Sequence, residues 1–120
     1  MWKLIRAEKF NRRLKEYSKN HPDEVLCVLD NLNKYFFMLE NGVKPRLISM
    51  GCIHIEPKGI IALDQKGSKG KLKQTRLYIY PDEEKEILYV MTLGDKHSQS
   101  DDIKECIKFV DDIRKGIIYE

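Results

Sequence analysis

The chain has 120 residues, of which 42% are hydrophobic and 34% charged, with a formal net charge of +3. This length suits one domain with a modest core, so we treat residues 1–120 as a single domain. No apolar run approaches the roughly 20 residues of a membrane span, and the N-terminus lacks the apolar core of a secretory signal, so we expect a cytoplasmic protein without a membrane partner. Cys27, Cys52 and Cys106 form no CxxC pair, and we expect neither a metal, nor another cofactor, nor a disulfide framework.

The first third of the chain predicts a short strand and two helices. Residues 2–6 alternate apolar and charged side chains, which indicates a strand. From residue 7 to 20, apolar residues recur at i, i+4 and i+7, as in an amphipathic helix. Pro22 suits the first position of a second helix, whose apolar stripe ends at the Asn41-Gly42 pair. Two helices with such a short joint predict an antiparallel αα-hairpin.

The remaining chain predicts a small antiparallel sheet followed by a helix, because the apolar period falls from 3.6 towards 2. We expect strands at 53–56, 60–63, 75–80 and 87–93, with turns at 57–59 and 81–84 and a flexible loop at 65–70. The final helix is expected to begin at Ser98 as N-cap, with Asp101 as its capping-box acid. Helices followed by strands are typical of an α+β fold rather than a parallel α/β fold.

Charge is unevenly distributed along the sequence. Residues 44–80 contain eight basic and two acidic residues, whereas residues 81–105 contain three basic and eight acidic residues. A basic centre beside an acidic flank suits a polyanion with a limited footprint, although a segregated solvated surface is the alternative. Lys69, Lys71 and Lys73 concentrate the positive charge just before the strand at 75–80, and we expect them to bind phosphate.

Several side chains in the predicted sheet suit chemistry on a phosphodiester. Arg76 stands on an otherwise aromatic strand face and can bind phosphate, although an ion pair with the acidic turn that follows is the alternative. Lys96 and His97 follow the next strand, and histidine can transfer protons near neutral pH. His54 and Glu56 share one strand face and are candidate bases, although either can be a simple hydrogen-bond or ion-pair partner.

The runs HIEPKGIIALDQKG (His54–Gly67) and TRLYIYPDEEKEILYVMTLGDKHSQSDDIK (Thr75–Lys104), in this order of elements, resemble the RelE/ParE/HigB superfamily of bacterial toxin–antitoxin toxins. The resemblance implies a RelE-like fold: an N-terminal strand and αα-hairpin packed on a small curved antiparallel sheet, with a C-terminal helix. It also implies a cognate antitoxin and a toxin that cleaves mRNA on the ribosome. The implied endoribonuclease reaction is metal-independent, with the ribose 2′-OH attacking the scissile phosphate to give a 2′,3′-cyclic phosphate and a 5′-OH.

The same resemblance implies a role for each candidate residue. Arg76 matches the family's strand arginine and would neutralise the phosphorane, while the basic stretch before that strand would hold phosphates. Glu56 lies where some members carry a general base, and His54 is the other candidate base. Lys96 and His97 lie in the end segment, where His97 would be the general acid.

The end segment, residues 94–99, departs from the family pattern because it contains no tyrosine. Many ribosome-dependent members use a tyrosine there to stack on or activate the nucleotide, and Tyr78 or Tyr80 would be the alternative stacking surface here. Members that poison DNA gyrase share the fold without cleaving RNA. Two alternative functions therefore stay open: a non-catalytic toxin of the gyrase-inhibitor type, and a catalytically degenerate RNA-binding module.

Overall fold

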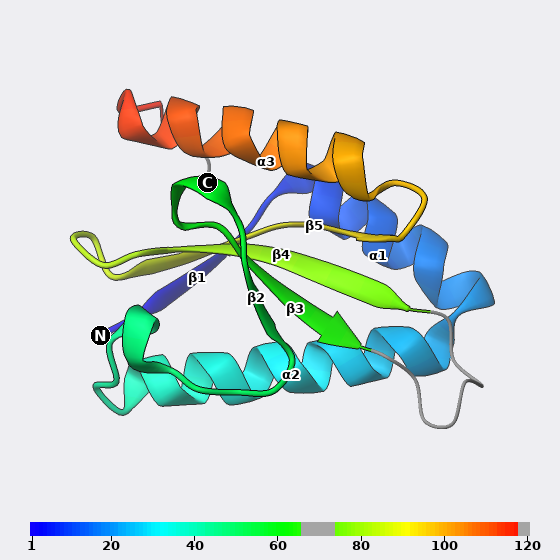
Figure 1. The fold of residues 1–120 in the computed structure, drawn as a ribbon, viewed down its shortest axis with the longest axis horizontal. Helices are drawn as coiled ribbons and strands as arrows, with labels where there is room; N and C mark the ends of the chain where they lie inside the picture. The colour runs from blue at the N-terminus through cyan, green and yellow to red at the C-terminus, as the bar shows by residue number, and fades with distance from the viewer. Residues whose placement is uncertain (66–73, 118–120) are drawn as a thin grey trace.

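The structure, a computed structural model, describes residues 1–65 and 74–117, and in this part of the chain three helices pack on a five-stranded sheet (Figure 1). The helices are α1 (Glu8–Asn20), α2 (Pro22–Glu40) and α3 (Gln99–Arg114). The strands are β1 (Lys3–Arg6), β2 (Ile53–Ile55), β3 (Ile61–Gln65), β4 (Thr75–Asp82) and β5 (Ile87–Asp95). Short 3₁₀ turns occupy Pro45–Leu47 and Pro57–Gly59. The α+β class predicted from the sequence is confirmed.

The strand order across the sheet is β1-β5-β4-β3-β2. Strands β2 to β5 pair antiparallel, as the sequence predicts. The N-terminal strand β1 instead pairs parallel with β5, residue 3 opposite 87 and residue 6 opposite 90. The sheet is therefore mixed: the predicted antiparallel sheet is extended at one edge by the N-terminal strand, which pairs parallel.

The face of the sheet beneath α1 and α2 carries the larger apolar core. Leu77 and Ile79 of β4 point to this face and are fully buried, as are Phe10 of α1 and Tyr35 of α2. Both helices of the predicted hairpin contribute to this one cluster, so their apolar stripes lie where the 3.6-residue period placed them.

The opposite face packs against α3, and Figure 1 shows α2 and α3 on opposite sides of the sheet. Tyr78 of β4 and Tyr89 of β5 meet Cys106 and Val110 of α3 here. The alternation predicted for β4 is confirmed, because Tyr78 points away from its two neighbours in the chain. Among the described helices, none combines the length and apolar character needed to cross a membrane.

Three strands extend beyond their predicted bounds, and β5 does so by two residues, ending at Asp95. Gln65, expected in a loop, belongs to β3 and pairs with Thr75. Strand β4 continues through Pro81 to Asp82, which pairs with Ile87. Proline is tolerated there because β3 begins at Ile61, opposite Ile79, and leaves that side of β4 as an edge at Pro81.

The start of α3 also differs from its predicted capping box. Ser98 stands at the N-cap position, but its side chain forms no cap hydrogen bond to the helix backbone. Its Oγ donates instead to Oδ2 of Asp102 at 2.7 Å. Asp102 lies four residues on and is fully buried, whereas Asp101 is exposed. The serine therefore faces the protein interior, where the buried carboxylate is the stronger acceptor.

Candidate functional site

A buried carboxylate, Asp64 of β3, lies at the centre of the candidate site. Its side chain is 1% exposed, yet three polar side chains face it. His54 Nε2 lies 3.2 Å from Oδ2, and the Gln74 amide donates to Oδ1 and Oδ2 at 3.3 and 3.2 Å. Arg76 Nε lies 3.7 Å from Oδ1. We call His54, Asp64, Gln74 and Arg76 the Asp64 cluster.

The sheet register brings the cluster together from separate strands. Asp64 of β3 is the cross-strand partner of Arg76 of β4. His54 of β2 pairs with Ala62, which shares a face with Asp64 because side chains two residues apart in a strand point the same way. Directly opposite side chains approach to about 5 Å and diagonal ones to about 7–8 Å, within reach of long side chains. Three neighbouring strands therefore present the cluster on the face that α3 partly covers.

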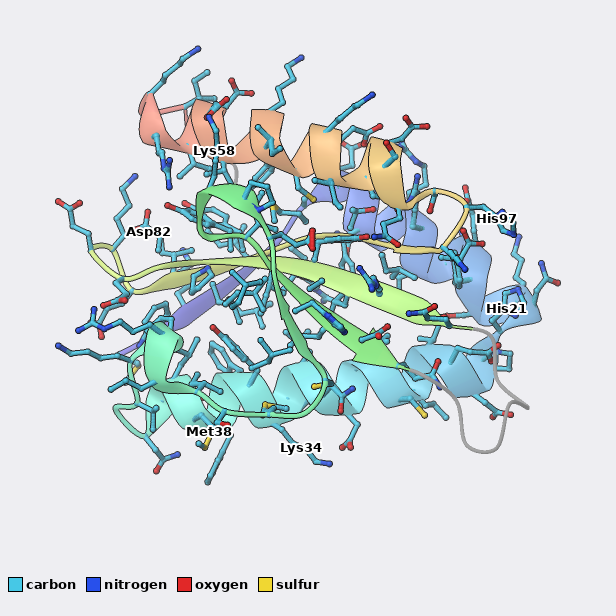
Figure 2. The ribbon with its side chains drawn as sticks, viewed as in Figure 1. His21, Lys34, Met38, Lys58, Asp82 and His97 are labelled. Carbon is cyan, nitrogen blue, oxygen red and sulfur yellow. The ribbon has the colours of Figure 1, made fainter. Side chains whose placement is uncertain are left out.

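Arg76 is held by Asp64 and not by the acidic turn that follows β4. Figure 2 shows Asp82, at the start of that turn, and His97 at opposite ends of the molecule. The Arg76 side chain is 14% exposed, and its Nε atom is buried without a hydrogen bond to any described residue. Since 3.7 Å is longer than a hydrogen bond, the guanidinium is paired by charge and still has donor capacity to offer an anion.

His97 and Lys96 lie in the turn between β5 and α3, and both are exposed. The register places Arg76 opposite Gly94, two residues before Lys96, so the turn and the arginine lie at the same end of the sheet. No hydrogen bond or ion pair joins the His97 side chain to the Asp64 cluster in the described part of the chain. Lys96 likewise forms no ion pair with any described carboxylate, including Asp101.

Glu56 follows β2 at the turn leading to β3, and its backbone N–H donates to the carbonyl of Ile60 at 2.9 Å. Its charge contributes to raising the pKa of Tyr78 and of Cys106, which places it on the α3 side of the sheet. Its carboxylate forms no ion pair with a described residue. Glu56 is therefore near the cluster's face but outside its hydrogen-bond network.

Tyr78 has to be removed from the predicted RNA-binding set. Its side chain is fully buried between the sheet and α3, so no base can reach its ring. Burial raises its pKa far above the ordinary value, and Asp102 adds to the effect. The other alternative, Tyr80, stacks on Tyr89 with 6.2 Å between ring centroids and lies beneath the guanidinium of Arg114. The sequence pattern identified a shared strand face but not the helix that covers it.

The predicted phosphate-binding lysines lie outside the described residues. Lys69, Lys71 and Lys73 all belong to residues 66–73, between β3 and β4.

Sequence reasoning missed Asp64 and Gln74. Asp64 follows four apolar residues at the end of a strand, and a carboxylate in such a run is a sign of a buried polar site. Gln74 directly precedes β4 and carries no comparable sign. Neither residue could be assigned to the same site as His54 before the register of the three strands was known.

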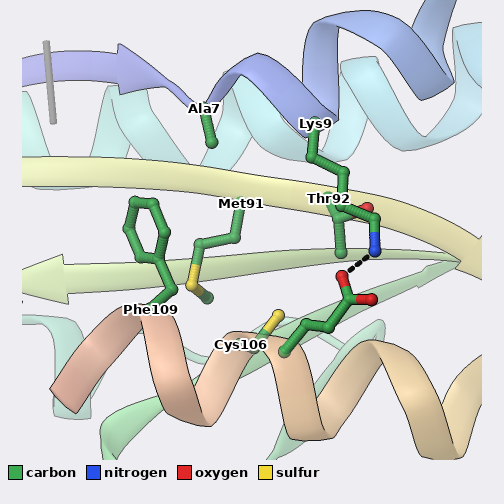
Figure 3. Close-up of a pocket in the computed structure, with 7 residues that line it drawn as sticks. Ala7, Lys9, Met91, Thr92, Cys106 and Phe109 are labelled. Carbon is green, nitrogen blue, oxygen red and sulfur yellow. Dashed lines mark ion pairs between the residues drawn. The ribbon is translucent and has the colours of Figure 1, made fainter. Parts of the chain in front are cut away.

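A small cavity between α1, β5 and α3 offers a contrast to the cluster (Figure 3). It measures about 90 Å³ and is lined mainly by apolar groups, including Ala7, Met91 and Phe109. An ion pair between Lys9 and Glu105 lies beside it. Burial raises the pKa of the Cys106 thiol, which also lines it, to about 12. A protonated thiol is a poor nucleophile, so the cavity offers less chemistry than the Asp64 cluster.

The Asp64 cluster pairs a proton-transfer group with a fixed cation. A buried carboxylate that bonds one ring nitrogen of His54 sets the tautomer and orientation of the imidazole. The described residues contain no group of three histidine, cysteine or acidic side chains arranged to hold a metal ion. Comparisons with family models, with curated proteins and with solved structures find no match to the chain.

Proposed function

We propose that the protein is the toxin of a toxin–antitoxin system, an endoribonuclease that cleaves mRNA on the ribosome without a metal ion. The observation that carries the proposal is the Asp64 cluster: an imidazole and a guanidinium on either side of one buried carboxylate. The Lys96-His97 turn lies at the same end of the sheet and supplies a second imidazole. An antitoxin that masks this surface is part of the proposal.

The reaction begins with removal of a proton from the ribose 2′-OH. Asp64 accepts a hydrogen bond from the Nε2–H of His54. The Nδ1 atom is then unprotonated, and its lone pair takes the 2′-OH proton. The 2′ oxygen then attacks phosphorus, and the bond from phosphorus to the 5′ oxygen breaks. His97 protonates that 5′ oxygen, which gives a 2′,3′-cyclic phosphate and a 5′-OH.

Arg76 neutralises the charge that develops on the phosphorane. Its guanidinium is held by Asp64 at 3.7 Å, so it is oriented before the substrate arrives. Lys96 adds positive charge at the same end of the sheet. Of the two candidate bases, His54 is favoured over Glu56, because only His54 is oriented by a buried partner.

Mapping mRNA ends after brief induction in cells tests the proposal. Wild type is expected to produce cuts inside translated codons, and Arg76→Ala to reduce their number about 100-fold or more, as expected for removal of a transition-state cation. Arg46→Ala is the matched control, because Arg46 is an exposed arginine on the 3₁₀ turn Pro45–Leu47. Circular dichroism verifies that both variants fold.

One result would overturn the proposed activity, and a second would overturn the assignment of its site. Intact mRNA in cells poisoned by wild type, with altered plasmid supercoiling, would assign the protein to the gyrase-inhibitor type instead. Undiminished cutting by Arg76→Ala would keep the nuclease but remove the Asp64 cluster from its site.

A further inference from the structure

The turn that carries His97 is closed by one carboxylate. Asp95, the last residue of β5, accepts hydrogen bonds at Oδ1 from the backbone N–H of His97 at 2.9 Å and from that of Ser98 at 3.1 Å. These two bonds fix the backbone on either side of the His97 α-carbon. The side chain of His97 is exposed, so the position of its imidazole depends on this backbone.

Asp95 also faces the helical hairpin. Burial, together with the charge of Asp95, raises the pKa of the Tyr17 hydroxyl of α1 to about 12, so this hydroxyl keeps its proton at neutral pH. The Tyr17 ring lies 5.5 Å from the ring of His21 at the joint between α1 and α2. The Asp95 carboxylate therefore lies where the end of β5 meets α1.

A buried network lies behind the same turn. Ser98 Oγ accepts from the backbone N–H of Asp95 at 3.2 Å and donates to Asp102 at 2.7 Å. Asp102 is fully buried and pairs at 2.7 Å with Arg13 of α1, which also donates to the carbonyl of Leu93 at 2.9 Å. The turn is therefore attached to α1 through Ser98, Asp102 and Arg13.

Gly94 shows how closely the strand approaches this network. A Cβ at residue 94 would lie 2.1 Å from Asp102 Oδ2 and 2.4 Å from Ser98 Oγ. Only glycine leaves room for the serine–carboxylate hydrogen bond beneath the strand, so the turn begins from a fixed point.

We propose that Asp95 is a positioning residue: its carboxylate holds the backbone of the Lys96-His97 turn so that the imidazole stays at the end of the sheet where Arg76 lies. The inference rests on the proposed function and assigns to that site a residue that acts through His97. Displacement of a general acid by about 1 Å can lower the rate of the catalysed step on the order of 100-fold. Fixing the backbone of this exposed turn therefore increases the rate.

Cleavage kinetics with the purified full chain, ribosomes and mRNA test the role. Asp95→Ala removes both turn hydrogen bonds, and kcat is expected to fall about 10–100-fold with KM little changed. Asp95→Asn keeps a side-chain oxygen as acceptor and is expected to retain kcat within a few-fold. Asp101→Ala is the matched control, because it removes an exposed carboxylate from the first turn of α3 and is expected to leave kcat unchanged.

A double-mutant cycle with His97→Ala separates positioning from a general structural role. If Asp95 acts through His97, then Asp95→Ala costs nothing further in the His97→Ala background. Equal losses in both backgrounds would overturn the inference, and so would an unchanged kcat in Asp95→Ala.

Amide hydrogen exchange by NMR supplies a readout that does not depend on activity. The His97 and Ser98 amides are expected to be protected in wild type and Asp95→Asn but to exchange rapidly in Asp95→Ala, while amides of β5 stay protected. Unchanged protection in Asp95→Ala would overturn the inference even if kcat falls in that variant. A wild-type protein that cleaves no RNA, with exchange as expected, would instead overturn the proposed function and the kinetic role with it, leaving the turn geometry intact.

Discussion

The two faces of the sheet differ in how completely helices cover them. Beneath α1 and α2, the strand residues are apolar and fully buried, as Leu77 and Ile79 show. On the other face, α3 packs over β5 and the Pro57–Gly59 turn, while His54, on the side of β2, keeps 36% of its side chain exposed. Neighbouring residues of one strand therefore contribute to stability on one side and, in the proposed function, to chemistry on the other. Substitutions at adjacent positions should separate the two.

The largest loss of unfolding free energy is expected for substitutions on the face that α1 and α2 cover. Leu77→Ala removes a fully buried side chain and should lower the free energy of unfolding by about 2–5 kcal/mol, because it combines lost burial with a cavity. Urea denaturation measures this loss. The neighbouring variant Arg76→Gln should abolish cleavage while costing less stability than Leu77→Ala. The comparison of faces fails if Arg76→Gln is the more destabilising of the two.

The next largest loss of unfolding free energy is expected for the ion pair that joins α1 to α3. Asp102→Ala removes the buried carboxylate that Arg13 and Ser98 share and should cost about 2–3 kcal/mol of unfolding free energy. The value lies below that of a fully buried pair because the Arg13 side chain is 22% exposed and can be rehydrated. Asp101→Ala should stay within about 0.5 kcal/mol. Similar losses for both aspartates, measured by urea denaturation, would contradict the buried network.

A pH dependence should distinguish the α3 face through Cys106. Burial raises the pKa of this thiol from 9.0 to about 12, so the folded protein binds its proton more tightly than the unfolded chain does. The associated stability is complete below pH 9 and is lost as the pH rises towards 12, by at most about 1.4 kcal/mol per pH unit. Urea midpoints at pH 7, 9, 10 and 11 should therefore fall less steeply for Cys106→Ala than for wild type. Parallel curves would show that packing of α3 against the sheet does not desolvate the thiol.

The smallest effect is expected where the chain passes from β1 into α1. Ala7 occupies the N-cap position of α1 with an extended backbone and provides no side-chain cap. Ala7→Ser should add about 0.5–1 kcal/mol and raise Tm by a few degrees. Thermal unfolding followed by circular dichroism measures the shift, with Ala7→Val as the control that adds bulk without a hydroxyl. A gain from valine equal to that from serine would attribute the effect to the adjacent cavity instead.

Much of the fold could be predicted because local periodicity encodes it. The helical stripe of α2 and the alternation of β4 both follow directly from the order of apolar residues. The inclusion of Pro81 in β4 could not be predicted, because it depends on where β3 begins relative to β4, opposite Ile79. The parallel pairing of β1 with β5 is likewise a property of residues more than 80 positions apart.

The site was predictable only in part. Arg76 and His54 were selected for their chemistry, and the structure places both against Asp64. Asp64 itself was missed because its importance comes from the strand register and not from its neighbours in sequence. Tyr78 was misassigned because an aromatic strand face gives no sign of whether solvent or a helix covers it.

The parallel edge strand has a consequence for how the protein is made. Residues 3–6 are synthesised well before their partners at 87–90. Contacts of such high sequence separation close a long loop and therefore slow folding. A nascent chain of this protein keeps β1 unpaired until β5 has been translated, so β1 is among the last of the described strands to reach its native neighbour.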